Sequence, residues 1–242
     1  MRILELDSGN TRLKWRLRDA GDITSRGVID NDSDVQGEVS DVLKQLAPVR
    51  QARLAIVSGQ ERLEMLCQVI EVQSGIPLSV VKVSDGQLGL SLAYTTIGVD
   101  RWLAMLAAHH SSAEKYKEKT KLVVSCGTAM TVDVVSGEGV HQGGFIVPGL
   151  QLMKKALSTS TAQLELIEAT ASEITPGWNS ADCINNGVLA MVSAMINAQV
   201  DRYPEAIVCL TGGDGELLSR FVGGEWEYRP ELVMDGIALA FD

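Results

Sequence analysis

Apolar and polar positions alternate along the first half of the chain in patterns that predict strands and helices in mixed order. Two strands flank the turn Asp-Ser-Gly-Asn-Thr at 7–11 and read as a β-hairpin. Apolar residues spaced three and four apart then predict helices between short buried strands. The predicted strands lie at 3–6, 13–17, 27–30, 53–57 and 78–83, and the predicted helices at 35–46, 61–71 and 101–110.

A similar order begins again after a polar stretch that starts at Ser111. A strand, a short turn and a second strand come first, and helices follow. The predicted strands are 121–124, 131–135 and 206–210, and the predicted helices are 150–157, 183–200, one from Glu216, and 232–240.

Two segments of the first half match two segments of the second half in the same order. LELDSGNTRLKW at 4–15 matches LVVSCGTAMTVD at 122–133, with Gly9 over Gly127. LAIVSGQERLEML at 54–66 matches IVCLTGGDGELLS at 207–219. The repeat predicts two similar α/β lobes, residues 1–118 and 119–242, joined near 111–120. A lobe that opens with a β-hairpin is not a Rossmann unit, which begins β-α-β.

Composition limits the function classes. The chain has 242 residues, 45% apolar and 21% charged, as is ordinary for a globular protein. Its net charge of −10 argues against general nucleic-acid binding, which needs a basic face, but allows a pocket for a small anion. The N-terminus shows no signal-peptide pattern and the chain has no apolar run of 18 residues, so we expect a cytoplasmic protein without membrane contact.

Cysteine and histidine give little indication of metal binding. The four cysteines are far apart without CxxC spacing, and we expect reduced core residues. We expect His109, His110 and His141 at the surface or at helix ends.

The two hairpin turns are candidates for phosphate binding. Glycine lets a turn approach a ligand closely, and successive backbone N–H groups form a concave anion site. Asp7 could hold Mg²⁺ directly or through water, and Lys14 could reach a phosphate. Hydroxyl donors would come from Thr11, Thr128 and Thr131. The same residue types also build turns for purely local reasons, so a plain turn stays an alternative, and the chain has no P-loop motif.

TGGDGELL at 211–218 offers a third element. Gly212 and Gly213 would give a surface without side chains on which adenine or ribose can lie. The alternative is a strand-to-helix turn in which Asp214 caps the helix. Similarly, Asp100 in IGVDRW at 97–102 could simply cap the helix 101–110, with Arg101 in solvent.

Taken in order, DSGNT, IGVDRW, GTAMTVD and GGFIVPGL resemble the type III pantothenate kinases, within the actin-like, ribonuclease H-like ATPase superfamily. The resemblance spans nearly the whole chain. It implies two ribonuclease H-like lobes, each opening with β-hairpins, with a mixed sheet flanked by helices. It also implies ATP- and Mg²⁺-dependent phosphorylation of pantothenate to 4′-phosphopantothenate, the first step of coenzyme A biosynthesis, by a homodimer.

The resemblance also implies roles for individual residues. Asp100 would be the general base and Asp7 would hold Mg²⁺ through water. The implied phosphate and ATP residues are Asp7, Ser8, Gly9, Asn10, Thr11, Arg12, Leu13, Lys14, Gly127, Thr128, Gly212 and Gly213. The implied pantothenate residues are Tyr94, Gly98, Val99, Asp100, Arg101 and Ser180, the last standing where the family has a threonine seven residues before a helical glycine, here Gly187.

One position departs from the family pattern. The second turn of the family usually begins with an aspartate associated with a monovalent cation, K⁺ or NH₄⁺, and here that position holds Ser125. A neutral hydroxyl is a weaker cation ligand than a carboxylate, so dependence on this cation is in doubt. Two alternatives stay open: another small-molecule kinase of the superfamily, and a non-catalytic accessory regulator related to the family.

Overall fold

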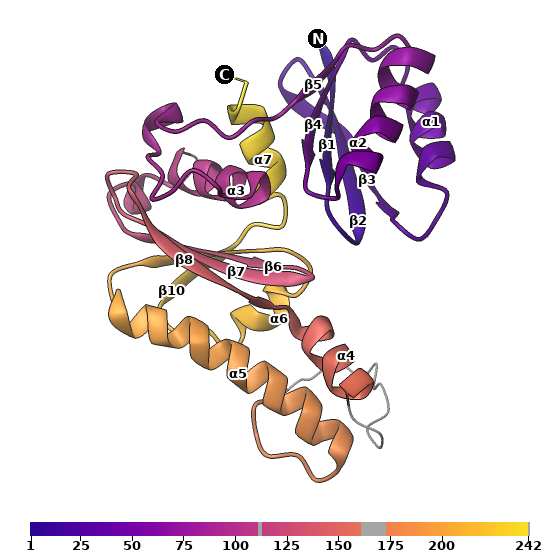
Figure 1. The fold of residues 1–242 in the computed structure, drawn as a ribbon. Helices are drawn as coiled ribbons and strands as arrows, with labels where there is room; N and C mark the ends of the chain where they lie inside the picture. The colour runs from indigo at the N-terminus through magenta and orange to yellow at the C-terminus, as the bar shows by residue number, and fades with distance from the viewer. Residues whose placement is uncertain (111–112, 161–172, 242) are drawn as a thin grey trace. The chain divides into compact units, whose positions relative to one another are not determined.

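The computed structural model describes residues 1–110, 113–160 and 173–241, so the first two residues of the expected linker 111–120 lie outside the described part. The chain forms two compact units (Figure 1). Unit 1 comprises Met1–Gln87, Thr96–Ala107 and Val233–Asp242, and unit 2 comprises Leu88–Thr95 and Ala108–Leu232. Each unit combines separate segments, and the lobe boundary after residue 118 stays a prediction.

The sheet of unit 1 has the strand order β3-β2-β1-β4-β5. Its first three strands are antiparallel, and the last two run parallel to β1. Alternate residues Leu4 and Leu6 point to one face, where they pack with the apolar sides of the helices. The strands are β1 Arg2–Ser8, β2 Arg12–Asp19, β3 Asp22–Asp30, β4 Gln51–Ile56 and β5 Leu78–Val80. The helices are α1 Val35–Leu46, α2 Gln60–Cys67 with its π-helical continuation Gln68–Gln73, α3 Val99–His110, which crosses into unit 2, and α7 Leu232–Leu239.

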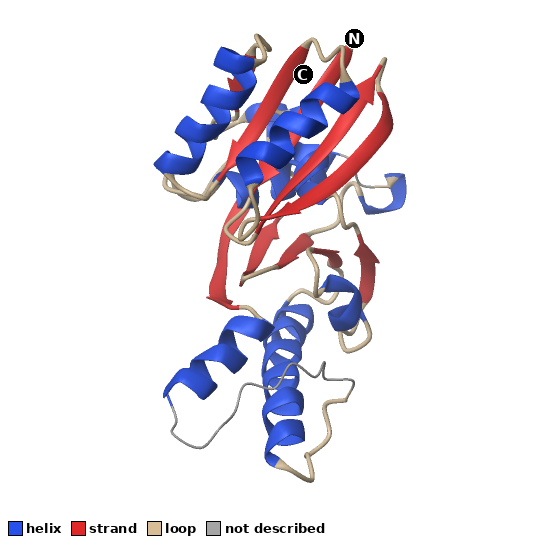
Figure 2. Cartoon of the chain, turned by 90° about the vertical axis from the view of Figure 1, so that its right-hand side faces the viewer, coloured by secondary structure: helices blue, strands red, loops and turns tan. Residues whose placement is uncertain are grey.

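The sheet of unit 2 has the order β10-β9-β6-β7-β8, and Figure 2 shows strands and helices together. Its core gathers the apolar residues of β6, β7 and β9 with one side of the long helix α5. The strands are β6 Lys121–Cys126, β7 Ala129–Val135, β8 His141–Pro148, β9 Ile207–Thr211 and β10 Glu225–Tyr228. The helices are α4 Leu150–Ser160, α5 Ser180–Arg202 and α6 Gly215–Ser219, and short 3-10 turns lie at Gln87–Gly89 and Glu114–Tyr116.

The two sheets have the same topology, which confirms the predicted repeat of two α/β lobes. Strands β1 to β5 correspond in order to β6 to β10, with the same parallel and antiparallel neighbours. The segment β4–α2 likewise corresponds to β9–α6.

The second hairpin is one residue tighter than the first. Asp7 lies opposite Lys14 in the first hairpin, whereas Ser125 lies opposite Thr131 in the second. The ungapped match of 4–15 with 122–133 is therefore correct before the turn and shifted by one residue after it.

Several sequence expectations were wrong. The strands β8 and β10 were not predicted. Cys183 is exposed and Cys67 is half-buried, so only two of the four reduced cysteines are core residues. His141 is 2% exposed and lies in the interior of unit 2 rather than at the surface.

One helix in the described part of the chain, α5, has the length and apolar composition that could cross a membrane. This is weak evidence, because core helices of globular proteins have the same properties. Val188, Leu189, Val192 and Ile196 of α5 are buried in the core of unit 2.

Candidate active site

The first candidate turn joins β1 to β2 and is held by backbone hydrogen bonds. The N–H of Gly9 donates to the carbonyl of Arg12 at 3.0 Å. Asn31, just after β3, donates its side-chain amide to the carbonyl of Gly9 at 2.9 Å and its backbone N–H to the carbonyl of Thr11 at 2.9 Å. The end of β3 therefore fixes the shape of the turn, while Asn10 and Thr11 stay exposed.

Asp7 lies at the end of β1 with Lys14 directly opposite on β2. Burial raises the pKa of Asp7 to about 6, the charge of Lys14 lowers it, and the charge of Asp100 raises it further. Asp100 belongs to the same unit, and its charge acts on Asp7. Carboxylates whose pKa is raised by burial and by a second carboxylate occur often at functional sites.

Asp100 lies in the first turn of α3. Its Oδ1 accepts a hydrogen bond from the backbone N–H of Arg101 at 2.8 Å. A Cβ on Gly98 would lie 2.7 Å from the same oxygen, so the glycine leaves room for the carboxylate. Since α3 begins at Val99, Asp100 is a residue of the helix and not a cap before it. Arg101 is 6% exposed, so the alternative of an arginine in solvent does not hold.

The carboxylate of Asp7 fits a Mg²⁺ ion that takes its other ligands from phosphates and water. The raised pKa of Asp7 shows that its charge is poorly compensated, and a bound cation would compensate it. No cluster of three or more histidine, cysteine or acidic side chains suited to a metal occurs among the described residues. Asp7 therefore fits a cation that takes its remaining ligands from outside the protein.

The second candidate turn joins β6 to β7 and contacts two other segments of unit 2. The N–H of Gly149 donates to the carbonyl of Thr128 at 2.9 Å, directly before α4 begins. On the other side, the N–H of Asp214 donates to the carbonyl of Cys126 at 3.3 Å. Gly212 has φ +89°, and a Cβ there would collide with the carbonyl of Cys126. The turn at Gly127 and Thr128 and the Gly212-Gly213 loop are thus adjacent, with little side-chain bulk between them.

Asp214 occupies the position before α6, but its carboxylate makes no capping hydrogen bond to that helix. Burial raises its pKa, and Lys154 of α4 lowers it. Lys154 is 4% exposed, and burial lowers the pKa of its own amine. The interaction of these two charges beside the glycine loop was missed by sequence reasoning. The only signal was a lysine one turn after Leu150, on the apolar side of the predicted helix.

The predicted pantothenate residues are divided between the units. Gly98, Val99, Asp100 and Arg101 belong to unit 1, as do Asp7–Lys14. Tyr94 belongs to unit 2, where its ring lies 5.7 Å from that of His141. Ser180 is the exposed first residue of α5, a helix capped by the side chain of Asn179. Each unit thus gathers one set of predicted site residues.

A family model for type III pantothenate kinase matches residues 3–202 of the chain. The chain belongs to the type III pantothenate kinase family. A type III pantothenate kinase of Hahella chejuensis is 37% identical over 244 residues, covering 99% of this chain and 97% of the relative. One from Pseudomonas aeruginosa strain LESB58 is 34% identical over 253 residues, covering 98% of each.

Solved structures show that members of this fold share the architecture seen here. A Campylobacter jejuni protein described as a Baf family transcriptional activator has a TM-score of 0.62 at 18% identity, covering 98% of this chain and 96% of the other. A Listeria monocytogenes protein described as an N-acetylmannosamine kinase has a TM-score of 0.56 at 13% identity, covering 100% and 98%. These likenesses confirm the actin-like ATPase fold expected for a type III pantothenate kinase.

Proposed function

We propose that the protein transfers the γ-phosphoryl group of ATP to the primary hydroxyl of pantothenate and releases 4′-phosphopantothenate and ADP, in the first step of coenzyme A biosynthesis. The observation that supports this most strongly is the pair of carboxylates, Asp7 and Asp100, whose charges interact within unit 1. It occurs in a chain that matches the pantothenate kinase family almost from end to end.

In this proposal Asp100 accepts the proton of the attacking hydroxyl. General base catalysis requires a carboxylate within hydrogen-bonding distance of that hydroxyl, about 3 Å. The bond from the Arg101 N–H engages one oxygen of Asp100 and orients the carboxylate. Gly98 and Val99 would line the acceptor site. The guanidinium of Arg101 matches the carboxylate of pantothenate, because its planar fork pairs with two oxygens.

The phosphates of ATP would lie against the glycine turns. Among Ser8 to Leu13, the backbone N–H groups that are not bonded within the hairpin would bind them, together with the Lys14 ammonium. Gly127, Thr128, Gly212 and Gly213 would be further nucleotide-binding residues. Mg²⁺ held through Asp7 and water would neutralise charge on the phosphates during transfer.

A monovalent cation has a small role in this proposal. Ser125 supplies a hydroxyl at the end of β6, and Thr131 supplies a second one opposite it. Neither adds the negative charge that would attract K⁺ or NH₄⁺ strongly.

The experiment is a kinase assay with purified protein, Mg²⁺-ATP and a panel of alcohols that includes pantothenate and hexoses, with ADP release as the readout. We expect release with pantothenate alone. Release with a hexose would indicate another kinase of the superfamily, and no release with any alcohol would favour the accessory regulator.

The role of Asp100 is tested by Asp100→Asn. We expect kcat to fall by about 10² or more, because the proton acceptor is lost, while ATP affinity measured by calorimetry stays near that of the wild type. Asp32→Asn, at an exposed aspartate, is the matched control and should leave kcat unchanged. A kcat near normal in Asp100→Asn would show that another group is the base.

A further inference from the structure

A buried histidine in unit 2 has no role in the proposed reaction. His141 is the first residue of β8 and is 2% exposed. Its Nε2 lies 3.1 Å from Oδ1 of Asp133, a carboxylate that is 1% exposed. Its Nδ1 is buried and has no hydrogen-bond partner among the described residues. A polar ring kept at such a position costs free energy, and that cost needs an explanation.

The sheet is built to bring His141 and Asp133 together. A register shift between Asp133 and Val135 places His141 opposite Val135, two residues along β7 from Asp133. Gly144 lies opposite Asp133, and a Cβ there would collide with the backbone carbonyl of Val132 and lie 2.5 Å from the Asp133 carboxylate oxygen. The glycine therefore leaves room for the carboxylate between the two strands.

The imidazole ring of His141 also packs beside the ring of Tyr94. The backbone N–H of His141 donates to the carbonyl of Ser91 at 2.9 Å, and the N–H of Ser91 donates to the carbonyl of Gly139 at 2.9 Å. These bonds attach the segment that carries Tyr94 to the start of β8. The rings of Tyr94 and His141 lie 5.7 Å apart at an interplanar angle of 50°, a tilted aromatic pair. Tyr94 itself is 38% exposed and so is accessible to a ligand.

We infer that His141, oriented by Asp133, is a positioning residue that fixes the ring of Tyr94 for binding the acceptor substrate. The carboxylate fixes the plane of the imidazole, since one ring nitrogen is engaged and the ring cannot rotate freely. The imidazole then supports one side of the tyrosine ring and leaves its exposed part for pantothenate. This inference rests on the proposed function, in which Tyr94 contacts pantothenate.

The inference predicts a selective effect on one substrate. In His141→Ala, the KM for pantothenate and its dissociation constant measured by calorimetry without ATP should rise about two- to tenfold, the range that a lost aromatic contact supports. The KM for ATP and the kcat should stay within about twofold of the wild type, because His141 acts on the substrate through Tyr94. His110→Ala, at an exposed histidine of the same unit, is the matched control and should change none of these values.

A second variant tests whether the aromatic ring at position 141 matters, as distinct from the polar pair of His141 and Asp133. It also keeps the inference testable if the alanine variant does not fold. His141→Phe combined with Asp133→Leu keeps an aromatic ring against Tyr94 and removes both polar partners together. We expect it to recover most of the pantothenate affinity. A double-mutant cycle then tests whether His141 acts through Tyr94. In a Tyr94→Ala background, His141→Ala should cause no further loss of pantothenate affinity.

Three results would overturn the inference. One is an unchanged pantothenate affinity in His141→Ala, and another is an equal loss of ATP and pantothenate affinity, which indicates general damage. The third is a full additional loss in the Tyr94→Ala background. If the wild-type protein neither binds nor phosphorylates pantothenate, the proposed function fails together with the inference. If it does both and the cycle is additive, only the inference fails.

Discussion

Asp7 has a carboxylate that the folded chain makes difficult to ionise. Its pKa is about 6 in the folded protein and 3.8 in its ordinary state, mainly because of burial. The folded state therefore holds the proton more tightly, and the ionised form lowers the stability of the fold. This loss is complete above about pH 6 and disappears as the pH falls toward 3.8, a difference on the order of 3 kcal/mol.

Asp7→Asn should therefore stabilise the protein at pH 7.5 while reducing its activity. We expect a higher Tm than that of the wild type in metal-free buffer, because the buried charge is gone. The gain should shrink as the pH is lowered to 4.5, where most wild-type Asp7 is protonated. Thermal unfolding at the two pH values measures this, with Asp32→Asn as the control. A Tm gain that is equal at both pH values would contradict the raised pKa of Asp7.

Ser125 should make the activity nearly independent of K⁺. The residue replaces the aspartate that the family usually has, and no carboxylate stands opposite it on β7, where Thr131 lies. We expect turnover to change less than about twofold when K⁺ replaces a large organic cation at fixed ionic strength, because a neutral hydroxyl attracts a cation weakly. Ser125→Asp should increase the response. A strong, saturable activation of the wild type by K⁺ would refute this prediction.

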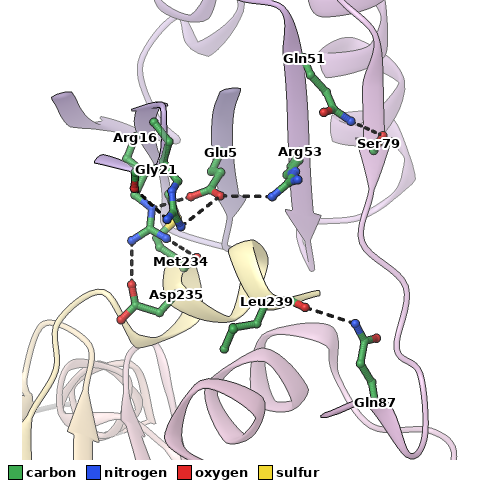
Figure 3. Close-up of polar contacts among 11 residues, drawn as sticks. Glu5, Arg16, Gly21, Gln51, Arg53, Ser79, Gln87, Met234, Asp235 and Leu239 are labelled. Atoms are coloured by element: carbon green, nitrogen blue, oxygen red, sulfur yellow. Dashed lines mark hydrogen bonds and ion pairs between the residues drawn. The ribbon is translucent and has the colours of Figure 1, made fainter. Parts of the chain in front are cut away.

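At the scale of elements, a buried charged cluster fastens α7 to the sheet of unit 1 (Figure 3). Arg16 donates from Nε to Glu5 at 2.6 Å, and its other nitrogens reach Asp235 at 2.8 Å and the carbonyl of Met234 at 2.6 Å. Glu5 is fully buried and also faces Arg53 at 3.8 Å. Gln87 adds a hydrogen bond of 3.3 Å to the carbonyl of Leu239. The last helix is thus attached through polar contacts as well as apolar packing.

Removing one member of this cluster should be costly. Arg16→Met leaves Glu5 buried beside a weaker partner, and we expect a loss of about 3–5 kcal/mol in the free energy of unfolding. Glu5→Leu combined with Arg16→Met should recover most of that loss, since the fully buried Glu5 and Arg16 charges are removed together, and Arg53 and Asp235, which lose a partner, are partly exposed. Urea denaturation of both variants measures the difference.

The matched control is Lys44→Met, which breaks an exposed pair with Asp41. It should cost less than about 1 kcal/mol. If Arg16→Met were as mild as this control, Arg16 would not compensate Glu5 as described.

The elements themselves were largely predictable, because their apolar positions follow the periods of strand and helix. α1 has the predicted bounds, and the strand order repeats as the matched segments indicated. β8 was missed because it contains two adjacent glycines, and β10 because it has four residues, two of them glutamates. The attachment of Arg16 to Asp235 spans 219 residues, and no local pattern reports a contact at that separation.

The candidate site was predictable to a similar extent. The glycine turns were predicted from residue types and order, and the role of Asp100 from the family resemblance. The structure adds the interaction of Asp100 with Asp7 and the burial of Lys154. Because the second hairpin is one residue shorter, Asp133 corresponds to Arg16 in the structure, whereas the ungapped match placed it with Trp15. A deletion within a turn changes the register without changing the apolar pattern, so the sequence match could not show it.

At the scale of the whole molecule, α4 and α5 carry large apolar side chains that their own unit leaves uncovered. Met191 of α5 is 56% exposed, Leu152 of α4 is 41% exposed, and Trp178, just before α5, is 97% exposed. Exposed apolar groups that recur on neighbouring elements are typical of surfaces that associate. A second copy of the chain would cover them and would also account for the apolar character of α5.

We therefore expect a homodimer of about twice the 26.0 kDa chain mass in light scattering coupled to size exclusion. Met191→Glu should shift the protein toward the monomer at micromolar concentration, because a charge would be buried in the interface. Val28→Glu, at an exposed valine of β3 in unit 1, is the matched control and should leave the dimer intact. Since Ser180 begins the same helix, the monomeric variant should also bind pantothenate more weakly. A monomeric wild type, or a dimer unaffected by Met191→Glu, would place the association elsewhere or exclude it.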